Sequence, residues 1–270
     1  MELRALNCDP AHMLQNIRCF ALDMDGTIYL GEQWIPGAQG FLAEVLRSGR
    51  EYFFLTNNSS KGVDAYVQKL AHMGLETERR RVVTSGIATI AFLKEHYASS
   101  NVFLLGNETL SEEFSRAGIR LVQTGADVVV TAFDTTLDYA KMCTLCDYVR
   151  GGLPYIATHP DSNCPTESGF IPDIGAIHAF VEESTGRRPD QIIGKPNRAI
   201  IDFLLNRSGT TAQQTAMVGD RLYTDIAVGV AHGLCSILVL SGETKAEELK
   251  DSPVQPHLVF DSLREVTPLL

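Results

Sequence analysis

Two aspartates stand directly after a short apolar run near the start of the chain. Residues 17–22 are mostly apolar and are followed by Asp23-Met24-Asp25-Gly26-Thr27. A run of this length is typical of a buried strand, and the glycine indicates a turn. Open α/β sheets bind ligands at such strand ends, and paired acids are costly unless a cation, such as Mg²⁺ with a phosphate ester, binds them. An acidic turn without a ligand explains the segment equally well.

Two more polar segments occupy the same position after an apolar run. Thr56 and Asn57 follow residues 51–55, and a hydroxyl beside free N–H groups at a turn binds anions readily. Lys195 follows Ile193-Gly194, and a single cation at a strand end can hold the oxygens of a transferring phosphoryl group. A helix N-cap and an ordinary surface lysine are the alternative interpretations.

A fourth segment again places aspartates after an apolar run. Asp220 follows Val218-Gly219, and Asp225 comes five residues later. Asp220 is a candidate to complete a magnesium site. Asp225 is a candidate to orient Lys195 or a metal-bound water without binding the ion itself. An acidic helix start, which the helix dipole favours, is the alternative for Asp225. Each segment alone has an ordinary explanation, but the four together have no shared one.

The alternation of apolar runs and helical stretches predicts an α/β fold with a parallel sheet covered by helices. The expected strands are residues 17–22, 51–55, 82–84, 102–105, 127–131, 154–157, 191–193, 215–218, 236–240 and 258–260. The expected helices are residues 38–48, 63–73, 87–97, 108–117, 137–149, 174–184 and 197–206, with a short helix at the C-terminal end. A second α/β unit is expected to begin near residue 84.

Length, composition and charge limit the classes of function. The 270 residues suffice for one large domain or two smaller ones, and their 44% hydrophobic content is typical of a globular protein. The net charge of −10 argues against a nucleic-acid partner, which requires a basic stripe. No apolar stretch reaches the roughly 18 residues of a membrane span, and residues 1–10 lack the apolar centre of a signal peptide. We therefore expect a cytoplasmic protein with no membrane partner.

The six cysteines are consistent with a reducing compartment. Cys19 and Cys235 lie in apolar runs, where a thiol packs as a small hydrophobic group. Cys143 and Cys146 lie three residues apart on an expected helix, and core packing is favoured over a redox pair or zinc because a second such pair is absent. Cys164 lies in an expected loop and is the expected exposed thiol.

The order of the four motifs resembles that of the haloacid dehalogenase (HAD) superfamily of phosphotransferases. The matching motifs are Asp23-x-Asp25-Gly-Thr, a strand ending in Thr56, a lysine after a strand, and Gly-Asp220-x4-Asp225. The long interval between the second and third motifs resembles the NagD-like and p-nitrophenyl-phosphatase-like subfamily, which carries an inserted cap. Further segments that resemble this subfamily are residues 55–59, 157–161, 165–169 and 185–189.

The resemblance implies a fold and an activity. The fold is a Rossmann-like HAD core at residues 1–83 and 187–270, with an α/β cap of the C2 type at residues 84–186 that closes over the site. The activity is a Mg²⁺-dependent phosphatase that hydrolyses small phosphomonoesters, such as p-nitrophenyl phosphate, nucleotides or sugar phosphates, through an aspartyl-phosphate. The expected cofactor is Mg²⁺, and the expected partner is a small phosphorylated metabolite.

The resemblance also implies a role for each motif residue. Asp23 is the nucleophile, and Asp25 protonates the leaving group and then activates water. The carboxylates of Asp23 and Asp220, with the backbone carbonyl of Asp25, hold Mg²⁺. Asp225 supports this site without binding the ion directly. The residues that bind the phosphoryl group are Thr56, Asn57 and Lys195.

Three positions depart from the pattern of the subfamily. His159 stands where asparagine is frequent, in the cap loop expected to meet the substrate, so His159 and the nearby Asp161 are candidates for substrate specificity. Glu243 stands where the subfamily usually has an apolar residue, and ordinary surface variation is favoured there over a role in choosing the leaving group. Asn197-Arg198 replaces an acidic residue and a proline.

Two alternative functions stay open. A phosphotransferase or phosphomutase of the same superfamily would pass the phosphoryl group to a sugar hydroxyl instead of water. A non-catalytic binding protein would keep the fold, although the intact set of Asp23, Asp25, Lys195 and Asp220 argues against it. The sequence leaves the physiological substrate and the oligomeric state undecided, and a homodimer is one alternative for the latter.

Overall fold

The computed structural model describes residues 9–166 and 169–270. Contacts divide the described chain into two compact units: residues 9–56, 67–83 and 201–270 form the first, and residues 57–66 and 84–200 form the second. The predicted division into a core at residues 1–83 and 187–270 and a cap at residues 84–186 stays a prediction. The expectations for Cys8, for the first residues of the chain and for Glu167-Ser168 lie outside the described residues.

A six-stranded sheet forms the centre of the first unit. The order is β15-β14-β13-β1-β4-β5, and the neighbours from β15 through β4 run parallel. The bounds are β1 (Cys19–Leu22), β4 (Glu51–Thr56), β5 (Val82–Thr84), β13 (Thr215–Gly219), β14 (Cys235–Val239) and β15 (Leu258–Phe260). Every residue of β1 and β13 is buried, as is usual for central strands of parallel sheets.

Amphipathic helices cover this sheet. The buried residues of α2 (Ala38–Arg47) are Ala38, Phe41, Leu42 and Val45, which form one face at helical spacing. The Phe41 ring meets the ring of Phe20 in β1 edge-on, with centroids 5.2 Å apart. The other elements of this part are α1 (Pro10–Leu14), β2 (Tyr29–Leu30), β3 (Gln33–Trp34), η1 (Arg79–Arg81), η2 (Ala212–Gln214), η3 (Leu222–Ile226), α9 (Ala227–His232), η4 (Ala246–Lys250), α10 (Leu263–Val266) and η5 (Thr267–Leu269).

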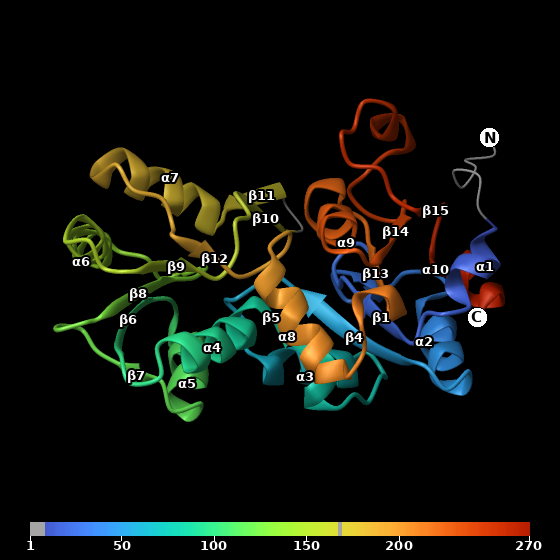
Figure 1. The fold of residues 1–270 in the computed structure, drawn as a ribbon, viewed down its shortest axis with the longest axis horizontal. Helices are drawn as coiled ribbons and strands as arrows, with labels where there is room; N and C mark the ends of the chain where they lie inside the picture. The colour runs from blue at the N-terminus through green and yellow to red at the C-terminus, as the bar shows by residue number, and fades with distance from the viewer. Residues whose placement is uncertain (1–8, 167–168) are drawn as a thin grey trace. The chain divides into compact units, whose positions relative to one another are not determined.

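A five-stranded parallel sheet forms the centre of the second unit, in the order β12-β9-β8-β6-β7. In Figure 1, α6 and α7 lie on one side of β8 and β9, and α4 and α5 lie on the other side of the sheet. The strands are β6 (Asn101–Leu105), β7 (Arg120–Leu121), β8 (Val128–Thr131), β9 (Tyr155–Ala157) and β12 (Gln191–Ile192). The helices are α4 (Ser85–His96), α5 (Glu108–Arg116), α6 (Tyr139–Arg150) and α7 (Ile174–Thr185).

Two helices connect residues of both units. They are α3 (Val63–His72) and α8 (Arg198–Ser208). Among the described residues, none of the helices combines the length and the hydropathy that a membrane crossing requires.

The predicted fold class, α/β with parallel sheets, is confirmed, and the predicted strands and helices appear with bounds within two residues. An antiparallel hairpin of β10 (Asn163–Thr166) and β11 (Gly169–Pro172) was not predicted. The sequence of this hairpin lacks the alternation of apolar and polar residues that marks a half-buried strand, and every residue of β11 is exposed.

The cysteine predictions are partly wrong. Cys143 is exposed and Cys164 is half-buried, so Cys164 is not the most exposed thiol. Cys146 packs in the core of the second unit as expected. Residues three apart are neighbours on a helix surface but do not point in the same direction. Cys143 therefore reaches solvent while Cys146 faces the core.

Candidate active site

Three aspartates of the first unit meet at the carboxyl ends of two neighbouring strands. Asp23 follows β1 and Asp220 follows β13, and in the parallel pairing of these strands Leu22 lies opposite Val218. Asp225 lies in the single turn η3 that follows. One carboxylate oxygen of each aspartate lies within 4.8 Å of the other two. The fold therefore brings together Asp23, Asp220 and Asp225, as the sequence predicted, and we call them the acidic cluster.

Backbone N–H groups fix the acidic cluster. The N–H of Asp23 donates to the Val218 carbonyl at 2.9 Å, in continuation of the sheet. The Oδ2 of Asp220 accepts from the N–H of Glu243 at 2.7 Å, and the Oδ2 of Asp225 accepts from the N–H of Arg221 at 3.1 Å. The last two bonds fix the positions of the Asp220 and Asp225 carboxylates.

Two glycines leave the room that Asp220 occupies. A Cβ on Gly242 would stand 1.9 Å from Asp220 Oδ2, and a Cβ on Gly26 would stand 2.4 Å from the same atom. Gly26 also has a φ of 87°, a conformation that glycine adopts without cost. The backbone of two other loops therefore packs directly against the carboxylate, and only glycine allows this approach.

The other two predicted residues of the first unit lie at the same edge of the sheet. Asp25 is exposed in the turn after β1, which is closed by a bond from the N–H of Gly26 to the Tyr29 carbonyl at 2.8 Å. Thr56 is buried at the last position of β4, which runs parallel to β1.

Arg221 adds a cation beside the acidic cluster. Its side chain is only 16% exposed, and its Nε lies 3.0 Å from the Oε2 of Glu243. Burial alone would lower the pKa of Arg221, but the negative charges of Asp23 and the two neighbouring aspartates raise it above its usual value. Sequence reasoning missed Arg221, although its place directly after Asp220 was a usable signal.

In the second unit, Asn57 holds the backbone of Lys195 through two hydrogen bonds. The N–H of Lys195 donates to Asn57 Oδ1 at 2.7 Å, and Asn57 Nδ2 donates to the Lys195 carbonyl at 2.9 Å. The same Nδ2 lies 3.1 and 3.2 Å from the two carboxylate oxygens of Asp161. The Lys195 residue is 2% exposed. Three predicted residues that are distant in sequence are thus joined within one unit.

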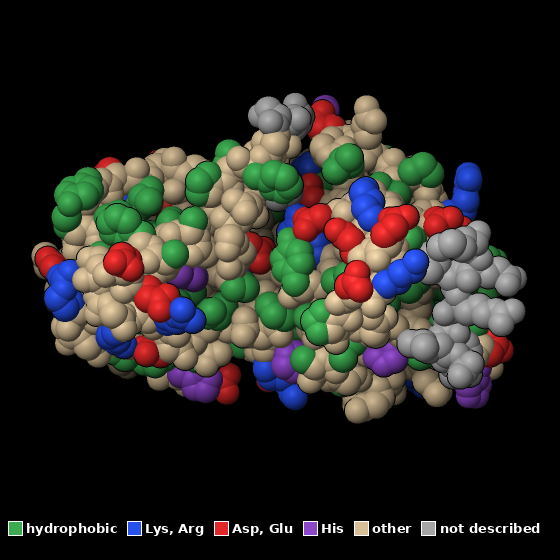
Figure 2. Space-filling model, turned by 90° about the horizontal axis from the view of Figure 1, so that it is seen from above, with side chains coloured by type: hydrophobic (Ala, Val, Ile, Leu, Met, Phe, Trp, Pro, Cys, Tyr) green, Lys and Arg blue, Asp and Glu red, His purple; other side chains and the backbone are tan. Residues whose placement is uncertain are grey.

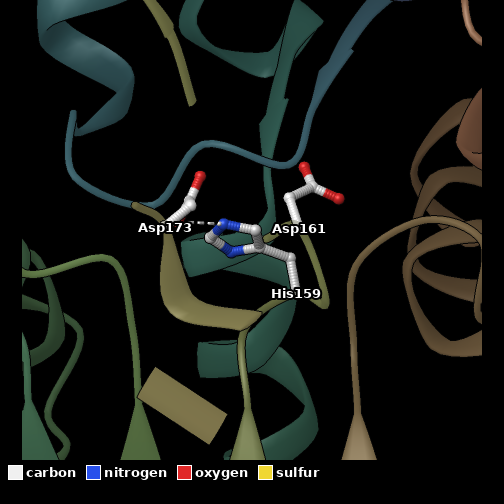
Figure 3. A group of neighbouring side chains, drawn as sticks. All are labelled: His159, Asp161 and Asp173. Atoms are coloured by element: carbon white, nitrogen blue, oxygen red, sulfur yellow. Dashed lines mark hydrogen bonds and ion pairs between the residues drawn. The ribbon is translucent and has the colours of Figure 1, made fainter. Parts of the chain in front are cut away.

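His159 lies in a second, fully buried network. Its Nε2 is 3.0 Å from Asp173 Oδ1, and its Nδ1 is 2.9 Å from Thr158 Oγ1. In Figure 3 the His159 ring points toward Asp173, with Asp161 beside it. Ligand atoms of His159, Asp161 and Asp173 lie within 4.8 Å of one another. Because both ring nitrogens already have protein partners, we interpret this group as a network that positions the loop rather than as a metal site.

Most of the sequence has counterparts among known proteins. Residues 20–120 match the family model of haloacid dehalogenase-like hydrolases, and residues 192–266 match the HAD-hydrolase-like model. The acid sugar phosphatase of Staphylococcus haemolyticus is 35% identical over 251 residues, which cover 93% of this chain and 95% of that protein. The chain belongs to the haloacid dehalogenase-like hydrolases.

Solved structures of this family share the complete fold. The 4-nitrophenylphosphatase from Thermotoga maritima is 43% identical with a TM-score of 0.93, and the match covers 95% of this chain and 98% of that one. NagD from Escherichia coli is 30% identical with a TM-score of 0.85, over 92% and 98% of the two chains. The predicted NagD-like and p-nitrophenyl-phosphatase-like branch of the HAD superfamily is confirmed, and so is the predicted class of activity, a phosphatase.

The acidic cluster of this HAD phosphatase fits a magnesium ion. Its three donors are carboxylate oxygens within 4.8 Å of one another, and Mg²⁺ prefers hard oxygen ligands of this kind. The group around His159 includes a nitrogen donor, which suits transition metals better. Of the two groups of metal-ligand side chains found among the described residues, the acidic cluster is therefore the one suited to magnesium.

Proposed function

We propose that this protein hydrolyses small phosphate monoesters, with sugar phosphates as the leading class of substrate. The observation that carries the proposal is the acidic cluster at the ends of β1 and β13. Two kinds of relative support the substrate class: proteins named acid sugar phosphatase and a protein named 4-nitrophenylphosphatase. Both names indicate a small phosphomonoester as the substrate of those proteins.

Asp23 and Asp25 carry the proposed chemistry. A carboxylate oxygen of Asp23 attacks phosphorus, the bond from phosphorus to the ester oxygen breaks, and Asp25 donates a proton to the leaving oxygen. Asp25 then takes a proton from water, which attacks phosphorus and breaks the bond to Asp23, so that phosphate is released. The covalent intermediate divides one difficult displacement into two easier steps. The exposure of Asp25 agrees with a group that exchanges protons with water.

Asp23 and Asp220, with the backbone carbonyl of Asp25, are the proposed ligands of the magnesium ion, and Asp225 supports them. When bound, the ion supplies positive charge that neutralises carboxylates and phosphoryl oxygens during transfer. The N–H groups that bond Asp220 and Asp225 then keep both carboxylates in place, so that little reorganisation is needed during the reaction.

The residues proposed to bind the phosphate of the substrate are Thr56, Asn57 and Lys195. Asn57 bonds both backbone polar groups of Lys195, so the position of this lysine depends on the amide. His159 and Asp161 are proposed to influence the choice of substrate. His159 is fully buried, so it would act by shaping the loop that contains Asp161, whereas Asp161 is half-buried.

We further propose a cytoplasmic location and a small-molecule partner. Five cysteines of the described chain are free thiols, and free thiols are characteristic of reducing compartments. On the face drawn in Figure 2, Lys and Arg side chains stand among Asp and Glu side chains rather than in a continuous stripe, which supports a partner other than nucleic acid. A homodimer stays a prediction, which the molar mass measured by light scattering tests.

Phosphate release from a panel of sugar phosphates, nucleotides and p-nitrophenyl phosphate tests the proposed function. We expect release with Mg²⁺, loss of activity with a chelator, and recovery when Mg²⁺ is restored. Parallel assays with free sugars as acceptors distinguish hydrolysis from phosphotransfer, because transfer yields a new sugar phosphate instead of phosphate. Activity that is unaffected by the chelator, or transfer without release, would contradict the proposal.

A further inference from the structure

Glu243 contacts the segment after β13 at three points. Its backbone N–H donates to Asp220 Oδ2 at 2.7 Å. Its carboxylate lies 3.0 Å from Arg221 Nε through one oxygen and accepts a hydrogen bond from the Tyr223 hydroxyl at 2.9 Å through the other. The loop after β14 is therefore attached to the acidic cluster by its backbone and to Arg221 by its side chain.

These two attachments are separable. Ser241 and Gly242 fix the loop independently of the Glu243 side chain, because the Ser241 hydroxyl donates to the Gly26 carbonyl at 2.8 Å and Gly242 packs against Asp220. A substitution that keeps the backbone N–H of residue 243 therefore preserves the bond to Asp220. It changes only the contacts of the side chain with Arg221 and Tyr223.

Arg221 carries a charge that opposes the binding of a cation by the acidic cluster. A guanidinium near the three aspartates interacts favourably with their negative charges and repels a divalent ion at the same place. The carboxylate of Glu243 neutralises part of this positive charge through an ion pair in which the arginine is largely buried. Screening by water is weaker at such a pair than at a fully exposed one.

We propose that Glu243 is a positioning residue that strengthens magnesium binding by holding and neutralising Arg221. This inference rests on the proposed function. Acting through Arg221, the Glu243 side chain sets how much positive charge the incoming ion meets. Tyr223 supports the arrangement by donating its hydroxyl to Glu243.

Magnesium binding measured by calorimetry without substrate tests this role. We expect Glu243→Gln to weaken binding about 3- to 10-fold and Tyr223→Phe to weaken it less. Arg221→Gln should tighten binding, and in that background Glu243→Gln should change the affinity less than about 2-fold. Glu247→Gln removes the same charge from an exposed position nearby and should leave binding unchanged. Thermal unfolding of each variant checks that the fold is retained.

The outcomes separate this inference from the proposed function. If the wild-type protein binds no magnesium, the proposed cofactor itself is wrong. If Glu243→Gln binds magnesium as tightly as the wild type, the role of Glu243 is overturned. If Arg221→Gln also weakens binding, the two residues serve only to hold the loop. An equal loss from Glu243→Gln in both backgrounds would mean that Glu243 acts on the ion directly, which contradicts positioning through Arg221.

Discussion

The acidic cluster of the first unit and the network around Lys195 in the second unit are built on opposite principles. Asp23, Asp220 and Asp225 place three like charges within 4.8 Å of one another, an arrangement that is costly unless a cation compensates it. Around Lys195, the amide of Asn57 bonds protein groups through both its oxygen and its nitrogen. The first region is suited to receive an ion, and the second fixes the position of its own lysine.

The largest expected effect comes from the nucleophile. Asp23→Asn should lower turnover about 10³-fold or more, because the amide cannot form the covalent intermediate. The fold should stay intact because the N–H of Asp23, which bonds to Val218, is retained. Phosphate release and circular dichroism measure the two properties, with the exposed Asp251→Asn as a matched control. Turnover near that of the wild type would exclude Asp23 as the nucleophile.

Replacement of the proposed acid and base should be the next largest effect. Asp25→Asn should lower the turnover of sugar phosphates about 10²- to 10⁴-fold, the usual contribution of general acid–base catalysis. The rate of the first step, in which the leaving group departs, should fall less for p-nitrophenyl phosphate, because nitrophenolate leaves without being protonated. The burst of nitrophenolate in rapid-mixing experiments reports that step. Equal losses for both substrates in that step would rule out Asp25 as the acid.

Two glycine substitutions separate the regions most cleanly. A Cβ at position 242 would overlap Asp220, whereas a Cβ on Gly194 would stand 2.7 Å from Asn57 Oδ1. Gly242→Ala should therefore weaken magnesium binding, on the order of 10-fold or more. Gly194→Ala should raise KM for the phosphate ester by a similar factor and leave magnesium binding near that of the wild type.

Calorimetry with magnesium and steady-state kinetics distinguish the two glycine variants. Gly40→Ala is the control, since a Cβ on this helical glycine meets no atom within 4 Å; it should be neutral or slightly stabilising. If Gly242→Ala and Gly194→Ala change magnesium binding alike, the assignment of magnesium binding to the acidic cluster and of phosphate binding to the network around Lys195 is wrong.

The smallest effect concerns stability in acid. His178 of the second unit donates to or accepts from Thr131 Oγ1 at 3.2 Å, and burial, with a smaller effect of the charge of His159, lowers its pKa from 6.5 to about 4. Between these two values the unfolded chain binds the proton that the folded chain excludes, so stability falls as the pH is lowered through this window. The loss is on the order of 3 kcal/mol at most.

His178→Gln tests this linkage. The variant should lose less stability between pH 7 and pH 4 than the wild type does, because its side chain does not titrate. Urea denaturation at several pH values measures the slope, and the exposed His72→Gln serves as the control. An unchanged slope in His178→Gln would show that another group controls acid stability.

The sequence predicted the acidic cluster because local patterns determine most of it. Apolar runs that end in Asp23 and Asp220 mark two strands, and parallel neighbours bring such ends to one edge of a sheet. The contacts of Glu243 with Arg221 could not be predicted, because they depend on how the loop after β14 folds over the loop after β13. The burial of His159 likewise depends on Asp173 at the start of α7, a tertiary contact without a local signal.

A crystal structure of the protein with Mg²⁺ and beryllium fluoride tests the central claim most directly, because beryllium fluoride mimics a phosphoryl group on a carboxylate. We predict a bond from beryllium to a carboxylate oxygen of Asp23, and a magnesium ion that Asp23 and Asp220 coordinate together. A fluoroberyllate attached to any other residue, or a magnesium ion bound without Asp23 and Asp220, would contradict the account.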